Sequence, residues 1–511
     1  MQLKFNKLFY LLLLLCFLNN CSNKENKVSP NIIYILADDL GYGEVGYNGQ
    51  EIIKTPNIDL LATNGMVFTQ HYSGAPVCAP ARYSLITGKH MGHSYIRGND
   101  EWRERGEVWD YIKAFSDPSL EGQRPIPENT VTIGKLLQKA GYTTGMFGKW
   151  GLGAPETVGV PNLQGFDAFY GYNCQRQAHN LYPSHLWENE TKVFLENDLI
   201  SPTTKLNPED NPMDESSYSI FTQKEYAPDK IHQKALSFIE NNRDNSFFLL
   251  YASPLPHLPL QAPVESVNTY REIIDDPNPY LGNQSYFPNR FPKATYAAMI
   301  THLDNQIGEL IQKLKEMGQY ENTIIVFSSD NGPTYLGGVD FDFFNSSKPF
   351  SNGYGKTKGF LYEGGIRVPM IVSWPNRIKP GSTSDHISSF YDVLPTLCDI
   401  TGANIPNKID GISFKNTLLN KKQKTHDFLY WEFPSYKGQQ AVRIGKWKGI
   451  RKNIFDGNMK IELYNLENDL GEEIDLSKDH PDIIKRIEKI MFNEHETAEL
   501  DRFKFKELND L

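Results

Sequence analysis

Oxygen-bearing side chains stand directly after two predicted strands of this 511-residue chain. The apolar run at 31–37 ends in Asp38 and Asp39, and the run at 323–329 ends in Asp330 and Asn331. Because ligands collect beyond the carboxyl ends of parallel strands, we expect these side chains to meet at one edge of a sheet. Carboxylate and amide oxygens suit a hard cation, Ca²⁺ or Mg²⁺, better than zinc. Either pair alone would indicate only a turn, so the predicted metal site depends on both together.

A cysteine in an unusual setting is the second candidate for chemistry. Cys78 lies in the stretch APVCAPARYSLITGKH, where Pro80 and Arg82 follow two and four residues later. The chain has five cysteines, and the other four are Cys16, Cys21, Cys174 and Cys398. The first two fall in an N-terminal targeting pattern, so an odd number remains and no complete disulfide framework is possible. Cys398 lies in an amphipathic helix pattern typical of core packing, and Cys174 lies in a polar loop that assigns it no role. Cys78 is the cysteine that stands out.

The elements that must position these residues alternate between strand and helix patterns. We predict an α/β fold with a large mixed, mostly parallel sheet flanked by helices over residues 31–420. The pattern changes after residue 420, where DFLYWEF, AVRIGKWKGI and IELYNL predict short antiparallel strands, followed by a helix at DIIKRIEKIMF. Residues 421–511 are therefore predicted to form a smaller α+β subdomain. The segments 100–125 and 200–225 are predicted to be long loops.

The N-terminus has the pattern of an export signal. Lys4 and Lys7 precede the apolar run LFYLLLLLCFL, which is too short for a comfortable membrane span. We predict a lipoprotein-type signal peptide at 1–20, lipidation of Cys21 and a polar tether at 21–30. The asparagine pair before Cys21 leaves plain secretion open. The expected location is the periplasm or the outer membrane of a Gram-negative bacterium, with the lipid as the sole membrane contact.

Composition argues against one class of partner. The formal net charge is −10, and hydrophobic residues make up 39% of the chain. These values are typical of a globular protein with a full core, and they do not indicate a nucleic-acid surface.

Five ordered motifs resemble a known family. The stretch CAPARYSLITG is similar to the signature of the formylglycine-dependent sulfatases, which are arylsulfatase-like members of the alkaline phosphatase superfamily. In that family the cysteine of a Cys-X-Pro-X-Arg motif is oxidised to 3-oxoalanine. The aspartates after the first strand, the later Asp-Asn pair, and the stretches GKWGLG, SPLPHLP and GKTKGFLYEGGIRVP fit the same family in order. The resemblance implies an alkaline-phosphatase-like fold, a sulfuric ester hydrolase and a sulfatase-maturating enzyme as a partner.

The resemblance also implies roles for individual residues. The hydrate of the aldehyde at Cys78 would attack sulfur with one hydroxyl, and its second hydroxyl would then allow sulfate to leave. Arg82, Lys149 and Lys358 would neutralise negative charge, and His257 would protonate the leaving oxygen. The cation, Ca²⁺ with Mg²⁺ as the alternative, would be bound by a set of five side chains: Asp38, Asp39, Cys78, Asp330 and Asn331.

Two positions depart from the family pattern. Many relatives have a histidine two residues after the lysine of the GKW motif, where this chain has Gly151. The base for the second half of the reaction is therefore unassigned, with His71 and His90 as the histidines nearest the cysteine motif. The serine common before the motif's arginine is Ala81 here.

Two polar segments are candidates for sugar binding. The stretches at 92–102 and 171–187 resemble those of bacterial exo-acting sulfatases on galactose or N-acetylgalactosamine units, which suggests a galactose-type 4-O- or 6-O-sulfate. The candidate contacts are His93, Arg97, Asn99, Gln175, Arg176, His179 and His185. Two alternatives stay open: a phosphodiester or phosphonate monoester hydrolase of the same superfamily, and a non-catalytic glycan-binding lipoprotein on the cell surface.

Overall fold

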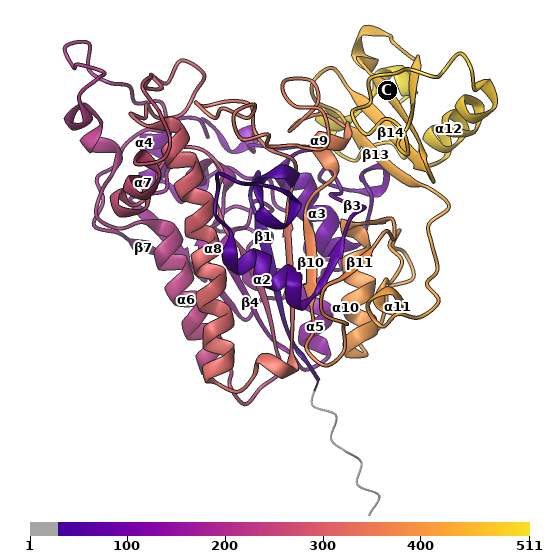
Figure 1. The fold of residues 1–511 in the computed structure, drawn as a ribbon, viewed down its shortest axis with the longest axis horizontal. Helices are drawn as coiled ribbons and strands as arrows, with labels where there is room; N and C mark the ends of the chain where they lie inside the picture. Colours follow the sequence, from indigo (N-terminus) through magenta and orange to yellow (C-terminus); the bar gives the residue numbers. More distant parts are fainter. Residues whose placement is uncertain (1–28, 511) are drawn as a thin grey trace, which may run out of the picture.

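The computed structural model describes residues 29–510. A ten-stranded mixed sheet forms its centre, in the order β11-β2-β10-β9-β1-β8-β4-β5-β6-β7 (Figure 1). The strands are β1 Asn31–Ala37, β2 Met66–Phe68, β4 Thr143–Lys149, β5 Ala168–Tyr172, β6 His185–Glu188, β7 Thr191–Phe194, β8 Phe247–Ala252, β9 Thr323–Ser329, β10 Met370–Ser373 and β11 Ser382–Ser384. The five central strands, β9 to β5, run parallel, whereas β10, β6 and β7 pair antiparallel with their neighbours. The predicted fold class is confirmed.

Helices cover both faces of this sheet, which is why its central strands are apolar along their whole length. Ile33 and Ile35 of β1 face one core, which includes residues of α2, α6 and α8. Ile32 and Tyr34 face the opposite core, which includes residues of α3, α5 and α10. The helices are α2 Pro56–Asn64, α3 Cys78–Thr87, α4 Tyr111–Ser116, α5 Ile133–Lys139, α6 Ala227–Asn241, α7 Val264–Arg271, α8 Pro292–Glu316, α9 Glu363–Ile366, α10 Val393–Thr401, α11 Lys415–Leu418 and α12 Pro481–Asn493.

A separate antiparallel sheet lies near the C-terminus, beside α9 (Figure 1). Its strands are β13 Leu429–Phe433, β14 Gln439–Ile444, β15 Trp447–Lys452 and β16 Ile461–Asn465, and α12 packs against it. The stretch AVRIGKWKGI, predicted as one strand, folds as the β14–β15 hairpin, because Gly445 has φ 54° and turns the chain. A short pair, β3 His71–Tyr72 and β12 Ser388–Ser389, completes the sheets of residues 29–510.

Segment 100–125 was predicted as a loop, but it contains α4. This helix has six residues, too few for its apolar periodicity to be visible, and it begins where the Asp110 side chain accepts the Lys113 N–H. Segment 200–225 is a loop that ends in a 3-10 turn at Glu215–Phe221.

Buried ion pairs join the C-terminal sheet to α9. Lys448 of β15 is fully buried, and its Nζ lies 2.9 Å from Glu363 Oε1 and 2.9 Å from Glu472 Oε1. Burial alone raises the pKa of Glu363, but the charges of Lys448 and Arg367 hold it at about 2. Burial raises the pKa of Glu472 to about 7 despite the neighbouring lysine. The C-terminal sheet is therefore connected to α9 through charges that have no water to screen them.

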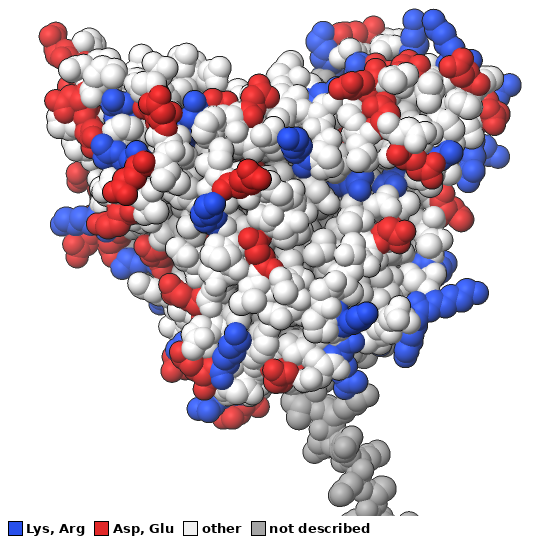
Figure 2. Space-filling model, viewed as in Figure 1, with Lys and Arg blue, Asp and Glu red and all other residues white. Residues whose placement is uncertain are grey.

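None of the helices within residues 29–510 has both the length and the apolar character required to span a membrane. The predicted signal peptide, the lipidated Cys21 and most of the tether lie outside the described residues. Over the face drawn in Figure 2, acidic and basic side chains are interspersed, and the upper edge is hollowed between the lobe that carries α4 and α7 and the lobe that carries the C-terminal sheet.

Candidate active site

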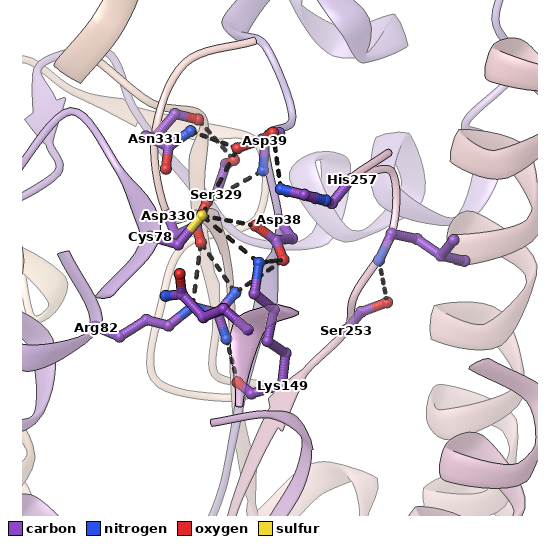
Figure 3. Close-up of polar contacts among 12 residues, drawn as sticks. Asp38, Asp39, Cys78, Arg82, Lys149, Ser253, His257, Ser329, Asp330 and Asn331 are labelled. Atoms are coloured by element: carbon purple, nitrogen blue, oxygen red, sulfur yellow. Dashed lines mark hydrogen bonds and ion pairs between the residues drawn. The ribbon is translucent and has the colours of Figure 1, made fainter. Parts of the chain in front are cut away.

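The ends of β1 and β9 bring four oxygen-bearing side chains together. The two strands are parallel neighbours in which Ala37 pairs with Ser329, so the residues that follow them emerge side by side. The Asp39 N–H donates to Asp330 Oδ1 at 3.1 Å, and Asn331 Nδ2 donates to Asp39 Oδ1 at 2.8 Å. The structure therefore gathers the residues that the sequence placed at this edge, as Figure 3 shows.

Cys78 points into the same cluster from the start of α3. It is 1% exposed, and its Sγ lies 3.3 Å from Asp38 Oδ1 and 3.9 Å from Asp39 Oδ1. The Asn99 side chain accepts the Ala79 N–H at 3.1 Å and so anchors the first turn of α3. Burial and the Asp38 carboxylate raise the pKa of the Cys78 thiol well above its ordinary value. The thiol is protonated at neutral pH and would be a poor nucleophile as it stands.

Three cationic side chains surround the cluster. Lys149, the last residue of β4, places Nζ 2.5 Å from Asp38 Oδ2 and 3.6 Å from Cys78 Sγ. Arg82 follows Cys78 by one helical turn, which puts both on one side of α3; its Nη2 lies 2.9 Å from Asp330 Oδ2 and 3.4 Å from Asp38 Oδ2. Lys358 Nζ lies 2.5 Å from Asp39 Oδ2. This positive charge is what a bound sulfate group requires.

These cations control the ionisation of the carboxylates. Burial alone raises the pKa of Asp38, but the positive charges of Lys149, Arg82 and Lys358 hold it well below its ordinary value. Burial and the nearby Asp38 charge raise the pKa of Asp330 to about 7. A divalent cation in this cluster would favour the charged form of each carboxylate.

The residues present fit a hard cation. Ligand atoms of Asp38, Asp39, Cys78 and His257 lie within 4.8 Å of one another, and all four residues are buried. Asn331 Oδ1 is also buried and has no hydrogen-bond partner among residues 29–510. An unpaired buried oxygen is costly, and a bound cation would remove that cost. Oxygen donors in this number are typical of Ca²⁺ or Mg²⁺ sites.

His257 enters the cluster from the loop after β8. Its Nε2 lies 3.6 Å from Asp39 Oδ2, and its Nδ1 donates to the Leu258 carbonyl at 2.7 Å. Burial, together with the charges of Lys149 and Lys358, lowers the pKa of His257 well below its ordinary value. The ring is therefore neutral and turns an acceptor nitrogen toward the site. The predicted contact residue His179 stacks on this ring, with centroids 5.3 Å apart.

Gln175 fills the space above Gly151, where many relatives have a histidine. Gly151 has φ 79°, and a Cβ at this position would lie 2.8 Å from Gln175 Nε2 and 2.9 Å from its Cγ. Gln175 Nε2 is buried without a hydrogen-bond partner in the described chain. The two histidines nearest the cysteine motif contact other groups: His71 lies 2.9 Å from Ser388 Oγ, and His90 lies 3.2 Å from Glu494 Oε2. An unpaired amide, rather than an imidazole, therefore occupies the space beside Gly151.

Four other candidate sugar contacts are engaged within the protein. Arg97 donates to Glu432 and to the carbonyls of Ser94, Gly92 and Glu496, and so ties its segment to the C-terminal sheet. The remaining three pairings are His93 with Asp410, Arg176 with the carbonyls of Val108 and Trp109, and His185 with Glu121. These placements do not support sugar contacts by Arg97 or Arg176, because protein acceptors already occupy their donors.

Sequence reasoning missed Tyr286, whose ring centroid lies 6.1 Å from that of His257 and 5.1 Å from that of His179. It comes from an irregular segment before α8, where no periodicity or motif marks it.

Comparison with known proteins identifies the family. The family model described as Sulfatase matches residues 30–403, and the one described as N-sulphoglucosamine sulphohydrolase, C-terminal, matches residues 354–507. Human arylsulfatase A is 31% identical over 82% of this chain and 74% of its own length. The N-acetylgalactosamine-6-O-sulfatase of Bacteroides thetaiotaomicron is 27% identical over 92% of this chain and 94% of its own length.

Solved structures agree with this assignment. The structure described as Ps i-CgsB in complex with k-i-k-neocarrahexaose has a TM-score of 0.70 and 27% identity, covering 92% of this chain and 94% of that one. The phosphonate monoester hydrolase of Agrobacterium radiobacter shares the fold, with a TM-score of 0.62 at 18% identity, covering 90% of this chain and 95% of that one. With the family model spanning most of the chain and the cysteine motif facing a cationic, oxygen-rich cluster, the chain belongs to the sulfatase family and is a sulfuric ester hydrolase.

Proposed function

We propose that this enzyme removes sulfate from galactose or N-acetylgalactosamine units at the end of a sulfated glycan, after oxidation of Cys78 to formylglycine. The observation that carries the proposal is the position of Cys78 Sγ. It lies 3.3 Å from Oδ1 of Asp38, a predicted ligand of the cation, and 3.6 Å from Lys149 Nζ. The substrate class is supported by relatives of the chain, which include an N-acetylgalactosamine-6-sulfatase of mouse that is 28% identical over 82% of this chain.

One set of side chains would bind the cation, and a second set would neutralise the charge of the sulfate group. Asp38, Asp39, Asp330 and Asn331 would hold the cation, which when bound withdraws electron density from a sulfate oxygen and from the attacking hydroxyl. The formylglycine hydrate supplies the nucleophile. Lys149, Arg82 and Lys358 place fixed positive charge where the sulfate group must lie, in a site from which water is largely excluded.

His257 is in place to handle the proton of the leaving alcohol. Its Nδ1 proton is committed to the Leu258 carbonyl, so only Nε2 can exchange a proton with substrate. Since the neighbouring lysines keep the ring neutral, protonation of Nε2 requires a further negative charge, which an entering sulfate ester would bring.

Mass spectrometry of the Cys78 peptide tests the nucleophile. Protein from a host that matures sulfatases should show a loss of about 18 Da, the change from a thiol to an aldehyde. An unmodified thiol in active protein would contradict the mechanism.

The same preparation should hydrolyse a galactose 6-sulfate, a galactose 4-sulfate or the corresponding N-acetylgalactosamine esters. Hydrolysis of phosphonate or phosphodiester esters in preference to sulfates would support the alternative that shares this fold.

Cation binding should be visible as a gain in stability. A cation that binds only the folded state at about 100 times its Kd adds about 2.7 kcal/mol to the free energy of unfolding. We therefore expect Ca²⁺, added to chelator-treated protein, to raise the Tm in calorimetry. Asn331→Ala should reduce this shift, whereas Asn416→Ala, at an exposed position of α11, should preserve it. Equal shifts in both variants would remove Asn331 from the cation site.

We also propose that the protein is exported and anchored by a lipid on Cys21, with a maturating enzyme as its partner before export. Labelling with a fatty acid analogue, lost in Cys21→Ala, tests the anchor.

A further inference from the structure

Four aromatic rings form a group at the edge of the active site, which we call the aromatic rim: Tyr335, Tyr354, Phe360 and Tyr436. Tyr335, Tyr354 and Phe360 come from the segment between β9 and α9, and Tyr436 comes from the β13–β14 turn of the C-terminal sheet. The rim is therefore built from two parts of the chain that lie beside each other in Figure 1, at α9 and β13.

The rim is directly connected to the catalytic cluster. A Cβ at Gly359 would lie 2.9 Å from Tyr436 Cε2 and 3.0 Å from its Cζ, so the Tyr436 ring rests on the Gly359 backbone. The residue before it is Lys358, whose Nζ lies 2.5 Å from Asp39 Oδ2. The Gly359 N–H donates to the Pro76 carbonyl at 2.8 Å, two residues before Cys78. The same short segment therefore supports the Tyr436 ring, supplies Lys358 to the cluster and hydrogen-bonds beside the cysteine motif.

The four rings hold one another in place. Their centroids are 5.1 Å apart for Phe360 and Tyr436, 5.2 Å for Tyr354 and Phe360, and 5.2 Å for Tyr335 and Tyr354. The Tyr335 hydroxyl donates to the Tyr436 hydroxyl at 3.4 Å. These contacts leave Tyr354 72% exposed and Tyr436 42% exposed. Large rings that are fixed in place yet open to water are typical of a binding surface.

The backbone at Tyr436 is strained in a way that presents its ring. Tyr436 has φ 49° and Lys437 has φ 67°, in the left-handed region that bulky residues rarely adopt. Such conformations are unfavourable for residues other than glycine and are concentrated at ligand sites. Here the strained turn keeps the Tyr436 ring against Gly359. A glycine at position 436 would relieve the strain but would provide no ring.

We propose that the aromatic rim binds the sugar next to the sulfated unit, so that the enzyme recognises an oligosaccharide rather than a single sugar. This inference rests on the proposed carbohydrate substrate. The C–H face of a pyranose ring carries partial positive charge and matches the negative face of an aromatic ring. The similar structure of 27% identity is a complex with k-i-k-neocarrahexaose, a hexasaccharide, which favours a glycan over a protein partner as the occupant of such a surface.

Binding and kinetics together test the rim. Calorimetric titration would measure binding of a galactose-based tetrasaccharide that is sulfated on its terminal unit. The protein would be Cys78→Ala, either alone or combined with Tyr354→Ala or with Tyr436→Ala. We expect each rim substitution to weaken binding about tenfold. In the active enzyme, each rim substitution should lower kcat/KM for the tetrasaccharide by a similar factor relative to kcat/KM for the sulfated monosaccharide. Phe492→Ala, at an 81% exposed ring on α12, is the matched control and should change neither quantity.

The outcomes separate the two proposals. A wild-type enzyme inactive on every sulfated sugar would reject the proposed function, while weaker tetrasaccharide binding by the rim variants would still support the rim. Unchanged binding in both rim variants, no tetrasaccharide binding by the parent protein, or an equal fall in kcat/KM for both substrates would overturn the rim as a sugar subsite.

Discussion

Cys78→Ala should lose sulfatase activity by at least about 10³-fold, because removal of a nucleophile leaves only the catalysis supplied by binding and fixed charge. The substitution removes one sulfur atom from a fully enclosed position, where the nearest groups are Asp38 and Lys149. Activity would be measured on the best substrate of the sulfated sugar panel, with folding checked by circular dichroism.

Cys398→Ala is the control for this variant. Cys398 is also fully buried, but it lies on α10 within the apolar core. Its loss should leave the activity per folded molecule unchanged. Full desulfation by the Cys78→Ala protein would overturn the proposed mechanism, whereas equal losses in both variants would point to a general defect in folding.

Lys448→Met should lower the free energy of unfolding by about 3–5 kcal/mol, since it removes one partner from a buried charge network. Glu363 and Glu472, each within 2.9 Å of the lysine, would then lose the positive charge that compensates them. Urea denaturation of the purified protein measures this loss.

An exposed ion pair of the same sheet region gives the comparison. Lys437 pairs with Asp456 at 2.8 Å, with side chains 65% and 52% exposed. Water screens such a pair, so Lys437→Met should have little effect on stability. A Lys448→Met protein as stable as the wild type would show that the network contributes no net stability.

Residues defined by strand ends were accessible from the sequence. Asp38 and Asp330 follow apolar runs that are typical of buried parallel strands, and the structure confirms that these two strands are parallel neighbours. The family motifs then identified Cys78, Lys149, His257 and a lysine at Lys358. The structure places all of these around one cluster, while the roles assigned to them stay predictions.

Residues whose surroundings come from distant parts of the chain were not accessible. Arg97 looked like a free loop residue, but its carboxylate partner is Glu432, 335 positions later. The packing of Tyr436 on Gly359 likewise joins two segments that no local pattern connects. The same holds for Gln175 above Gly151, because a glycine in a motif does not reveal which side chain occupies the space it leaves.

The burial of Cys78 bears on whether its proposed oxidation comes before or after folding. Only 1% of this residue is reachable from solvent, and it is held by groups from β1, β4 and α3 together. A maturating enzyme cannot bind Cys78 in its active site once the residue is buried at the start of α3, against Asp38 and Lys149. The proposed oxidation of Cys78 would therefore have to precede folding, while β4, which begins about 65 residues later in the chain, is not yet packed against the motif. On the proposed mechanism, a chain that folded before this oxidation would lack its nucleophile.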